Sequence, residues 1–220
     1  MKAIGDSLPR RFKATASGAI TAGKPLIVEA DGDVAQVTET SITQAVGTPS
    51  VFESASIEDS SAVYDSSAEK IVIVYSDKGN GSAGTAVVAT VSDTSISYGT
   101  PVVFASDSTD YLRAAYDSNA QKVVVSFRDV GNSNYGTAIV GTVSCTSISF
   151  STDLVYESAS PSEPDITYDA NAQKVVICYG DEGNSRYATA VVGTVSGTSI
   201  SFGTPYTFNS SSSKFFAIAY

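Results

Sequence analysis

Acidic side chains are the main groups in this sequence that could carry out chemistry. They gather in segments of differing sequence, FESASIEDS, FASDSTDYL and YESASPSEP, with a fourth such segment, FNSSSSKFF, near the end. The candidate residues are Glu53, Glu58, Asp59, Asp107, Asp110, Tyr111, Glu157 and Glu163. Two carboxylates can act as acid and base in glycoside hydrolysis, and variable loops on a constant scaffold often bind ligands. The segments are therefore candidates for carbohydrate binding or hydrolysis, and solvated acidic loops are the alternative.

The other residue types argue against catalysis. The 220 residues include no histidine, which excludes a Ser-His-Asp triad, a His-Cys dyad and a His-ligated metal site. A sialidase-like hydrolase needs an arginine cluster, and we expect Arg113, Arg128 and Arg186 not to converge. The formal net charge of −10 argues against a general nucleic-acid binder. We therefore expect a protein that is not an enzyme and uses no cofactor.

A repeat of 52 residues positions these groups. The spacing holds for three sets of residues: Asp65, Asp117 and Asp169; Asp77, Asp129 and Asp181; Gly79, Gly131 and Gly183. Repeats begin near residues 47, 99, 151 and 203, and the last is incomplete. A fixed period near 50 indicates a repeat architecture.

Each repeat predicts four strands. In the first they are a strand that ends at residues 64–65 and strands over 70–77, 84–92 and 95–104, all rich in Val, Ile, Thr and Tyr. Both faces of 70–77 are apolar, so neighbouring sheets should cover it on both sides. The prediction is an all-β fold of antiparallel four-stranded repeats that form β-propeller-like blades. A stacked β-sandwich or solenoid is the alternative.

The repeated polar residues are expected to shape turns. Asp65 and its two equivalents can accept hydrogen bonds from backbone N–H groups between the first two strands. Asp77 and Gly79, with their equivalents, form a D-x-G turn in which the glycine is expected to supply a positive φ. A calcium loop is the weaker alternative, because few oxygen ligands lie close in sequence. The D-x-G turn partly resembles the Asp-box of sialidase-type propellers.

Residues 1–45 are predicted to be a separate region. Its first 13 residues carry a net charge of +3 from Lys2, Arg10, Arg11 and Lys13, and form a solvated tail or a docking arm for an acidic neighbour. A hairpin is expected from 26–30 and 33–39, and residues 46–220 form the β-repeat domain.

No signal peptide or transmembrane stretch is recognisable. Two cysteines form no disulfide framework: Cys145 belongs to a turn and Cys178 to the core.

The segment GAITAGKPLIVEADGDVAQV resembles a short β-segment near the start of many tailed-bacteriophage virion proteins, and the Tyr-Asp…Asp-x-Gly-Asn repeats are similar to repeats of phage structural proteins. This resemblance implies a virion surface protein, made in the host cytoplasm, such as a head-decoration protein, head fibre or tail-fibre component. Its implied partners are other capsid or tail proteins, further copies of itself and, where it attaches to the host, a host-surface glycan. Neither nucleic-acid binding nor membrane insertion is expected. The alternative function is a carbohydrate-binding, lectin-like adhesin.

The position of the last residue fits the repeat. Tyr64, Tyr116 and Tyr168 each precede the turn aspartate, and Tyr220 is next in this series. Three full periods are fewer than the four to eight blades of an ordinary propeller. The expectation is that more chain follows, with ring closure by several copies as the alternative.

Overall fold

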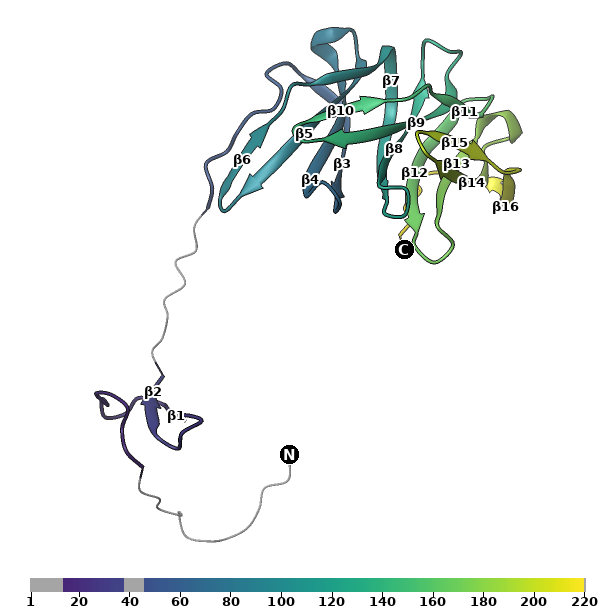
Figure 1. Ribbon diagram of the computed structural model, residues 1–220. Coiled ribbons are helices and arrows are strands. Elements are labelled where there is room, and N and C mark those ends of the chain that lie inside the picture. The colour runs from purple at the N-terminus through teal and green to yellow at the C-terminus, as the bar shows by residue number, and fades with distance from the viewer. Residues whose placement is uncertain (1–13, 38–45, 220) are drawn as a thin grey trace. The chain divides into compact units, whose positions relative to one another are not determined.

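A computed structural model describes residues 14–37 and 46–219 of the chain. Contacts within the chain divide it into two compact units, residues 1–45 and 46–220. Each unit is described by itself, and Figure 1 labels the strands of both.

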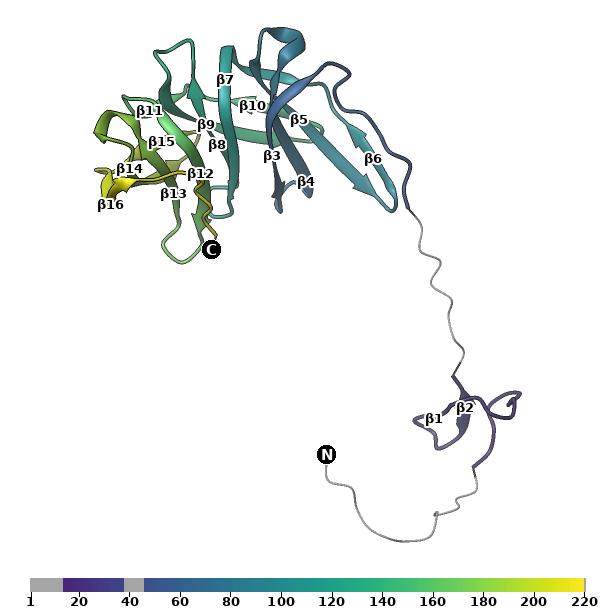
Figure 2. The same cartoon turned by 180° about the vertical axis from the view of Figure 1, so that it is seen from behind.

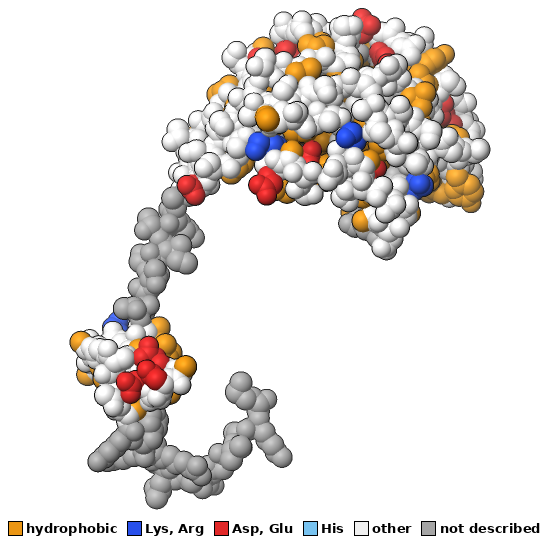
Figure 3. All heavy atoms as spheres, in the orientation of Figure 1, with side chains coloured by type: hydrophobic (Ala, Val, Ile, Leu, Met, Phe, Trp, Pro, Cys, Tyr) orange, Lys and Arg blue, Asp and Glu red, His pale blue; other side chains and the backbone are white. Residues whose placement is uncertain are grey.

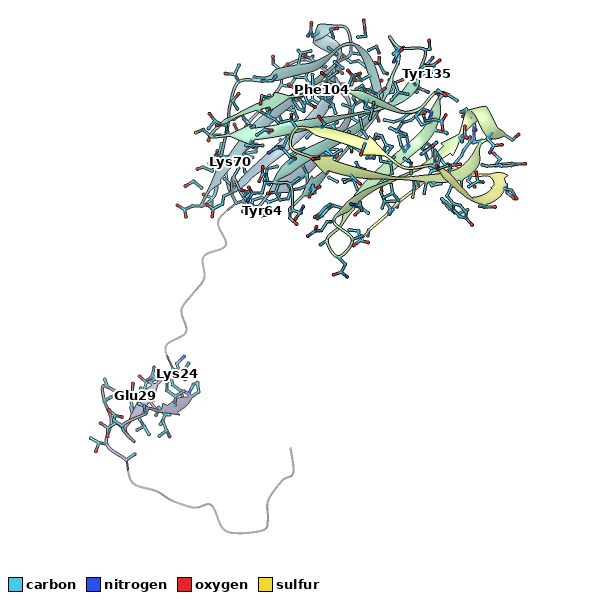
Figure 4. The ribbon with its side chains drawn as sticks, turned by 45° about the vertical axis from the view of Figure 1, so that its right-hand side comes forward. Lys24, Glu29, Tyr64, Lys70, Phe104 and Tyr135 are labelled. Atoms are coloured by element: carbon cyan, nitrogen blue, oxygen red, sulfur yellow. The ribbon has the colours of Figure 1, made fainter. Side chains whose placement is uncertain are left out.

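The smaller unit contains a β-hairpin. Strands β1 (Leu26–Val28) and β2 (Val34–Gln36) pair antiparallel, in the place predicted for a hairpin but shorter. The turn is closed by a 2.8 Å bond from the Glu29 N–H to the Asp33 carbonyl, and Gly32 adopts a φ of 91° that favours glycine. Lys24 and Glu29 are labelled beside this hairpin in Figure 4. Leu26, Ile27 and Val28 are exposed, so the hairpin presents an apolar strand to solvent.

The strands of the larger unit form two sheets, one of nine strands and one of five. In chain order they fall into three groups. The first group is β3 (Ile57–Asp65), β4 (Lys70–Asp77), β5 (Ala83–Ser92), β6 (Ser95–Tyr98) and the start of β7 (Val102–Asp117). The second is the rest of β7 with β8 (Lys122–Asp129), β9 (Tyr135–Ser144), β10 (Ser147–Phe150) and β11 (Leu154–Glu157). Strand β7 joins these two groups into the nine-stranded sheet. The third is β12 (Pro161–Asp169), β13 (Lys174–Asp181), β14 (Tyr187–Ser196), β15 (Ser199–Phe202) and β16 (Tyr206–Ser212). Two 3-10 helices, η1 (Lys78–Asn80) and η2 (Glu182–Asn184), complete the described elements.

Every strand pair in the larger unit is antiparallel. The prediction of an all-β fold with antiparallel sheets is therefore confirmed. In the described residues, which include only the two short 3-10 helices, no helix could cross a membrane. The groups stand side by side, with β3 next to β7 and β7 next to β12 (Figures 1 and 2).

The predicted continuous strand over 95–104 is wrong. The structure breaks it at 99–101 into β6, which pairs with one half of β5, and the start of β7, which pairs with the other half. Pro101 has no N–H to donate, and Gly99 instead donates to the Val88 carbonyl at 2.8 Å. The same break occurs between β10 and β11 and between β15 and β16.

Two apolar clusters hold the groups together. Val72 and Val74 of β4 pack into one cluster with Val123 and Val125 of β8, and all four side chains are fully buried. Val124, from the opposite face of β8, belongs to the second cluster, which joins the second group to the third. The central strand β8 is thus covered on both faces. Burial of each such side chain contributes about 1.5–3 kcal/mol.

The prediction that both faces of 70–77 are covered is wrong for one face, because in β4 Val72 and Val74 are buried whereas Ile71 and Ile73, on the opposite face, are only half-buried.

Aromatic triads reinforce both junctions. Phe104, at the start of β7, lies 5.5 Å from the Phe127 ring and 5.1 Å from the Phe150 ring. The equivalent triads, shifted by 52 residues in either direction, are Phe52–Tyr75–Tyr98 and Tyr156–Tyr179–Phe202. The triads of Phe104 and Tyr156 tie the outer strand that precedes a group to the central strand of that group, and Phe52 contacts Tyr75 in the same way from the segment before β3. Such ring pairs add about 0.5–1.5 kcal/mol beyond burial.

The outer face of the third group is open. Val88 and Val140 are each 1% exposed, whereas Val192, at the same repeat position, is 46% exposed. Tyr206 and Phe208 are exposed beside it, and Figure 3 shows apolar side chains gathered at this end, where Figure 1 places β16. Cys178 also lies on this face and is half-buried, so its predicted place in the core is wrong. Partial burial and the nearby Asp165 raise the pKa of its thiol.

The turn aspartates bond as the sequence predicts. One oxygen of Asp117 accepts from the N–H groups of Asn119 at 3.0 Å and Ala120 at 2.9 Å. Asp65 and Asp169 do the same in the other groups. The Tyr168 hydroxyl also accepts from the Asn119 N–H, at 3.3 Å, so a residue of the third group caps a turn of the second. Tyr168 therefore couples a turn of the second group to the packing of the third group.

Asp117→Ala should lower the free energy of unfolding by about 1–2 kcal/mol, because Asp117 is 1% exposed and two backbone donors would lose their acceptor. Urea unfolding would measure this loss. Asp169→Ala removes the same two bonds at a half-exposed turn, where water can replace them, and serves as the matched control. Equal losses for both variants would contradict the role assigned to burial.

The role predicted for the D-x-G glycines is wrong. Positive φ values occur at Gly81 and Ser185, later in these turns, and not at Gly79, Gly131 or Gly183. The glycines instead allow close approach of the preceding loop. A Cβ on Gly79 would lie 2.6 Å from the Ala55 Cβ, and one on Gly183 would lie 2.8 Å from the Ala159 Cβ. Any side chain at these positions would push that loop away.

The turn aspartates of the D-x-G motif differ among the groups. Asp77 accepts from the Gly79 N–H at 2.9 Å and Asp129 from the Asn132 N–H at 3.1 Å. One oxygen of Asp181 is buried without a hydrogen-bond partner among the described residues. The aspartate side chain therefore bonds to the turn in the first two groups, whereas in the third group the Arg186 N–H donates to the Asp181 backbone carbonyl at 2.7 Å.

Candidate functional site

Two of the predicted loop acids are structural. Glu157 accepts a 2.8 Å bond from the Tyr179 hydroxyl with one oxygen, and a 3.0 Å bond from the Ala159 N–H with the other. Glu53 makes the equivalent bonds with Tyr75, at 3.5 Å, and with the Ala55 N–H, at 2.8 Å. Both tyrosines are fully buried, so these carboxylates satisfy hydroxyls that would otherwise be unpaired in the core.

The second group lacks both the tyrosine and the glutamate, and this joint absence supports the structural assignment. Phe127 stands where the other groups have Tyr75 and Tyr179, and Ala105 stands where they have glutamates. A phenylalanine has no hydroxyl to satisfy, so the carboxylate has no role at that position. The tyrosine and the glutamate are therefore replaced together, as expected if the hydrogen bond between them is the role of both.

Stability should fall as the pH rises above about 10. Burial, with a contribution from Glu53, raises the pKa of Tyr75 to about 12. An unfolded tyrosine titrates near pH 10. Between about pH 10 and 12 the unfolded chain releases a proton that the folded chain keeps, so rising pH favours unfolding. Burial raises the pKa of Tyr179 in the same direction, with Glu157 adding to it.

Thermal melting between about pH 8 and 12 would measure this dependence. Tyr75→Phe should make the melting temperature fall less steeply with pH, because its titrating hydroxyl is gone. Tyr64→Phe is the control, since that side chain is 56% exposed. An identical pH slope in wild type and Tyr75→Phe would contradict the prediction.

Three other loop acids lie apart from one another. Glu58 pairs with Lys78 at 2.7 Å on the surface, and Asp110 pairs with Arg128. Asp107 packs against Gly131 and lines a cavity of about 200 Å³ together with Asp129 and Asp153. Within the described residues, no group of three or more histidine, cysteine or acidic side chains is arranged to hold a metal ion.

A bulge recurs at one position of strands β3, β7 and β12. Asp59, Tyr111, Glu163 and Phe215 are each 52 residues apart and have positive φ values of 37°, 54°, 49° and 59°. The strand register shifts around the first three of them. Non-glycine residues rarely adopt this conformation, and bulges of this kind re-aim side chains near functional sites. The repeat thus turns four chemically different side chains toward one region.

Those four residues line the bulge pocket, a cavity of about 480 Å³. Its walls are formed by Asp59, Tyr111, Arg113, Glu163, Phe215, Phe216 and Ala217. One oxygen of Asp59 accepts from the Tyr111 N–H at 2.9 Å, and one oxygen of Glu163 accepts from the Phe215 N–H. Each bond joins a bulge residue of one repeat to its equivalent in the next, so neighbouring strands fix both carboxylates.

Of the three arginines that were expected from the sequence not to converge, Arg113 lines this pocket and Arg128 and Arg186 do not. Arg113 lines it and contacts Asp165 at 3.9 Å, while the Arg128 guanidinium lies 4.7 Å from the centre of the Tyr111 ring. Asp110 pairs with Arg128 and holds it there. Arg186 pairs with Glu182, in the turn between β13 and β14, and does not line the pocket.

The site was only partly predictable. Asp59, Tyr111 and Glu163 were candidates from the sequence, whereas Arg113, Phe215 and Phe216 were missed. Phe215 could have been found from the 52-residue spacing, because three steps of that length lead from Asp59 to Phe215. Residues Lys2, Arg10, Arg11 and Lys13, predicted to form a docking arm, lie outside the described residues. Chemically, the pocket offers fixed hydrogen-bond acceptors, one guanidinium and apolar rings, a combination suited to binding a polar ligand.

No protein-family model, no curated protein and no solved structure matches this chain.

Proposed function

We propose that the protein is a non-catalytic structural protein of a tailed-bacteriophage virion surface, as a head-decoration protein, a head fibre or part of a tail fibre. Its N-terminal region anchors it to a capsid or tail protein, and its strand groups project outward as a homo-oligomer. The observation that carries the proposal is that the repeated polar residues form hydrogen bonds within the protein. Most of them bond to backbone or to the next group, which is the behaviour of a scaffold.

The smaller unit supports the anchoring role. Among its described residues Val34 is the one buried apolar side chain, and Leu26, Ile27 and Val28 are about half exposed. A segment of this size cannot bury enough apolar surface to be stable alone. An attachment surface on another virion protein provides the missing contacts. The four basic residues before it favour an acidic surface.

In the same proposal the three strand groups are β-propeller-like blades. Support comes from their face-to-face packing through two apolar clusters and from the neighbouring positions of β3, β7 and β12. In a solenoid, backbone ladders would join equivalent strands of successive repeats. The contacts from β3 to β7 instead include side-chain acceptors, such as the 3.2 Å bond from the Ala114 N–H to the Ser61 hydroxyl.

Fractionation of a lysate of the source culture on a density gradient tests the main proposal. Peptide mass spectrometry should find the protein with DNA-containing particles, and its confinement to the particle-free fraction would refute the virion role. A variant with Lys2, Arg10, Arg11 and Lys13 replaced by glutamine should lose particle association and keep the melting temperature of the wild type. Retained association would refute the docking arm.

Carbohydrate binding for host attachment is the second candidate function. The bulge pocket favours it, because carboxylates, a guanidinium and aromatic rings converge there. A glycan array probed with the full chain tests this candidate independently of particle association.

A further inference from the structure

We propose that the bulge pocket binds an uncharged sugar ring and rejects acidic sugars. This inference rests on the carbohydrate-binding candidate above and assigns the ligand class of that site. Its volume of about 480 Å³ falls within the range of about 300–1,000 Å³ typical of small-molecule sites.

The mixture of donors and acceptors selects a ligand that needs both. Asp59 and Glu163 are acceptors when ionised, and the Arg113 guanidinium is a donor. Each sugar hydroxyl both donates and accepts, so it can use all three groups. An anionic ligand would meet two carboxylates, which outnumber the single guanidinium, and Arg113 already contacts Asp165 at 3.9 Å. An uncharged polyol meets no such repulsion.

The polar groups are held in place before any ligand arrives. Each carboxylate uses one oxygen to accept from a backbone N–H, of Tyr111 or of Phe215, and its other oxygen has no protein partner among the described residues. Arg113 donates through one terminal nitrogen to the Leu112 carbonyl at 2.7 Å. Because these side chains are already ordered, little conformational entropy is lost when a ligand binds.

The aromatic side chains supply an apolar surface for the sugar's C–H face. Arg128 stacks on the Tyr111 ring, which fixes the ring and occupies one of its faces. Phe215 is 84% exposed and lines the pocket with Phe216. A large exposed apolar ring beside fixed polar groups is typical of a ligand surface. Phe215 is therefore the expected stacking residue.

Saturation-transfer NMR on the full chain tests the inference with five probes. The uncharged probes are methyl glucoside, methyl galactoside and N-acetylglucosamine, and the charged probes are N-acetylneuraminic acid and glucuronic acid. At least one uncharged probe should bind, and the charged probes should bind at least tenfold more weakly. Glu163→Gln and Phe215→Ala should each weaken binding at least tenfold. Glu58→Gln is the matched control, since it removes a nearby exposed carboxylate outside the pocket.

Melting temperatures establish that each variant is folded, and Asp59→Asn replaces Glu163→Gln if the latter is not. Preferential binding of a charged probe would overturn the inference and leave carbohydrate binding standing. Binding that both pocket variants leave unchanged would overturn the pocket assignment alone. Absence of binding by all five probes would overturn the inference, and a positive glycan array would then show that the second candidate function survives elsewhere on the chain.

Discussion

Val140→Ala is expected to lower the free energy of unfolding by about 2 kcal/mol, whereas Val192→Ala should change it by less than about 0.5 kcal/mol. The two valines occupy the same position of successive repeats. Val140 is 1% exposed and packs in the cluster between the second and third groups, while Val192 is 46% exposed on the open face. Removing two methyl groups costs transfer energy and leaves a cavity only where a neighbour covers them.

Val88→Ala extends this comparison to the first group. Val88 is 1% exposed and packs against the second group. Val88→Ala should therefore lower the free energy of unfolding by about as much as Val140→Ala. Differential scanning calorimetry would show both as a fall of about 4–8 °C in melting temperature for a unit of this size. A large loss for Val192→Ala at micromolar protein, absent on dilution, would show that another copy covers the face. That result would contradict the expectation of an open face.

A double-mutant cycle at Glu157 and Tyr179 is expected to give the second large effect. Each single change, Glu157→Ala or Tyr179→Phe, should cost about 2–3 kcal/mol, because it leaves one buried partner of a 2.8 Å charge-assisted bond unsatisfied. The double variant should be more stable than the sum of the single losses predicts, by about 1.5–3 kcal/mol. Urea unfolding of the four proteins provides the coupling energy.

The second group contains the natural counterpart of this double variant. Its Ala105 and Phe127 pack without a hydroxyl or a carboxylate, and the Phe127 ring is 1% exposed. Glu53 and Tyr75 supply a further comparison, since their bond is longer, at 3.5 Å, and should give a smaller coupling energy. Additive losses at Glu157 and Tyr179 would show that the two side chains act independently.

The architecture was largely predictable because its signals are local. The residues of β4, β8 and β13 appear in the sequence as apolar runs that start with lysine and end with aspartate, and their bounds agree with the predicted 70–77 in the first repeat. The hairpin of β1 and β2 was predictable from its turn for the same reason. Strand alternation and turn chemistry depend on neighbours within a few residues, so the sequence displays them directly.

The functions of individual polar residues were less predictable. Glu53 and Glu157 look like free loop acids in the sequence, yet they bond to tyrosines 22 residues away in the chain. Gly79 looks like a turn glycine, yet its role is to let the loop at Ala55 approach. In both cases the deciding contact is distant in sequence, and a turn pattern contains no information about it.

The sequence by itself determined the repeat, the strand class and the turn aspartates, because each depends on composition and short spacing. Only the tertiary structure decided which acids share a pocket. Asp59, Tyr111 and Glu163 become neighbours because β3, β7 and β12 lie side by side and each bulges at the same position, and Phe215, which follows β16, donates its backbone N–H to Glu163. The tertiary structure also decided that Val140 is buried and Val192 is not, although both occur in the same tripeptide, Val-Gly-Thr. Burial depends on whether a further group packs on that face, and the residue's own sequence neighbourhood cannot specify this.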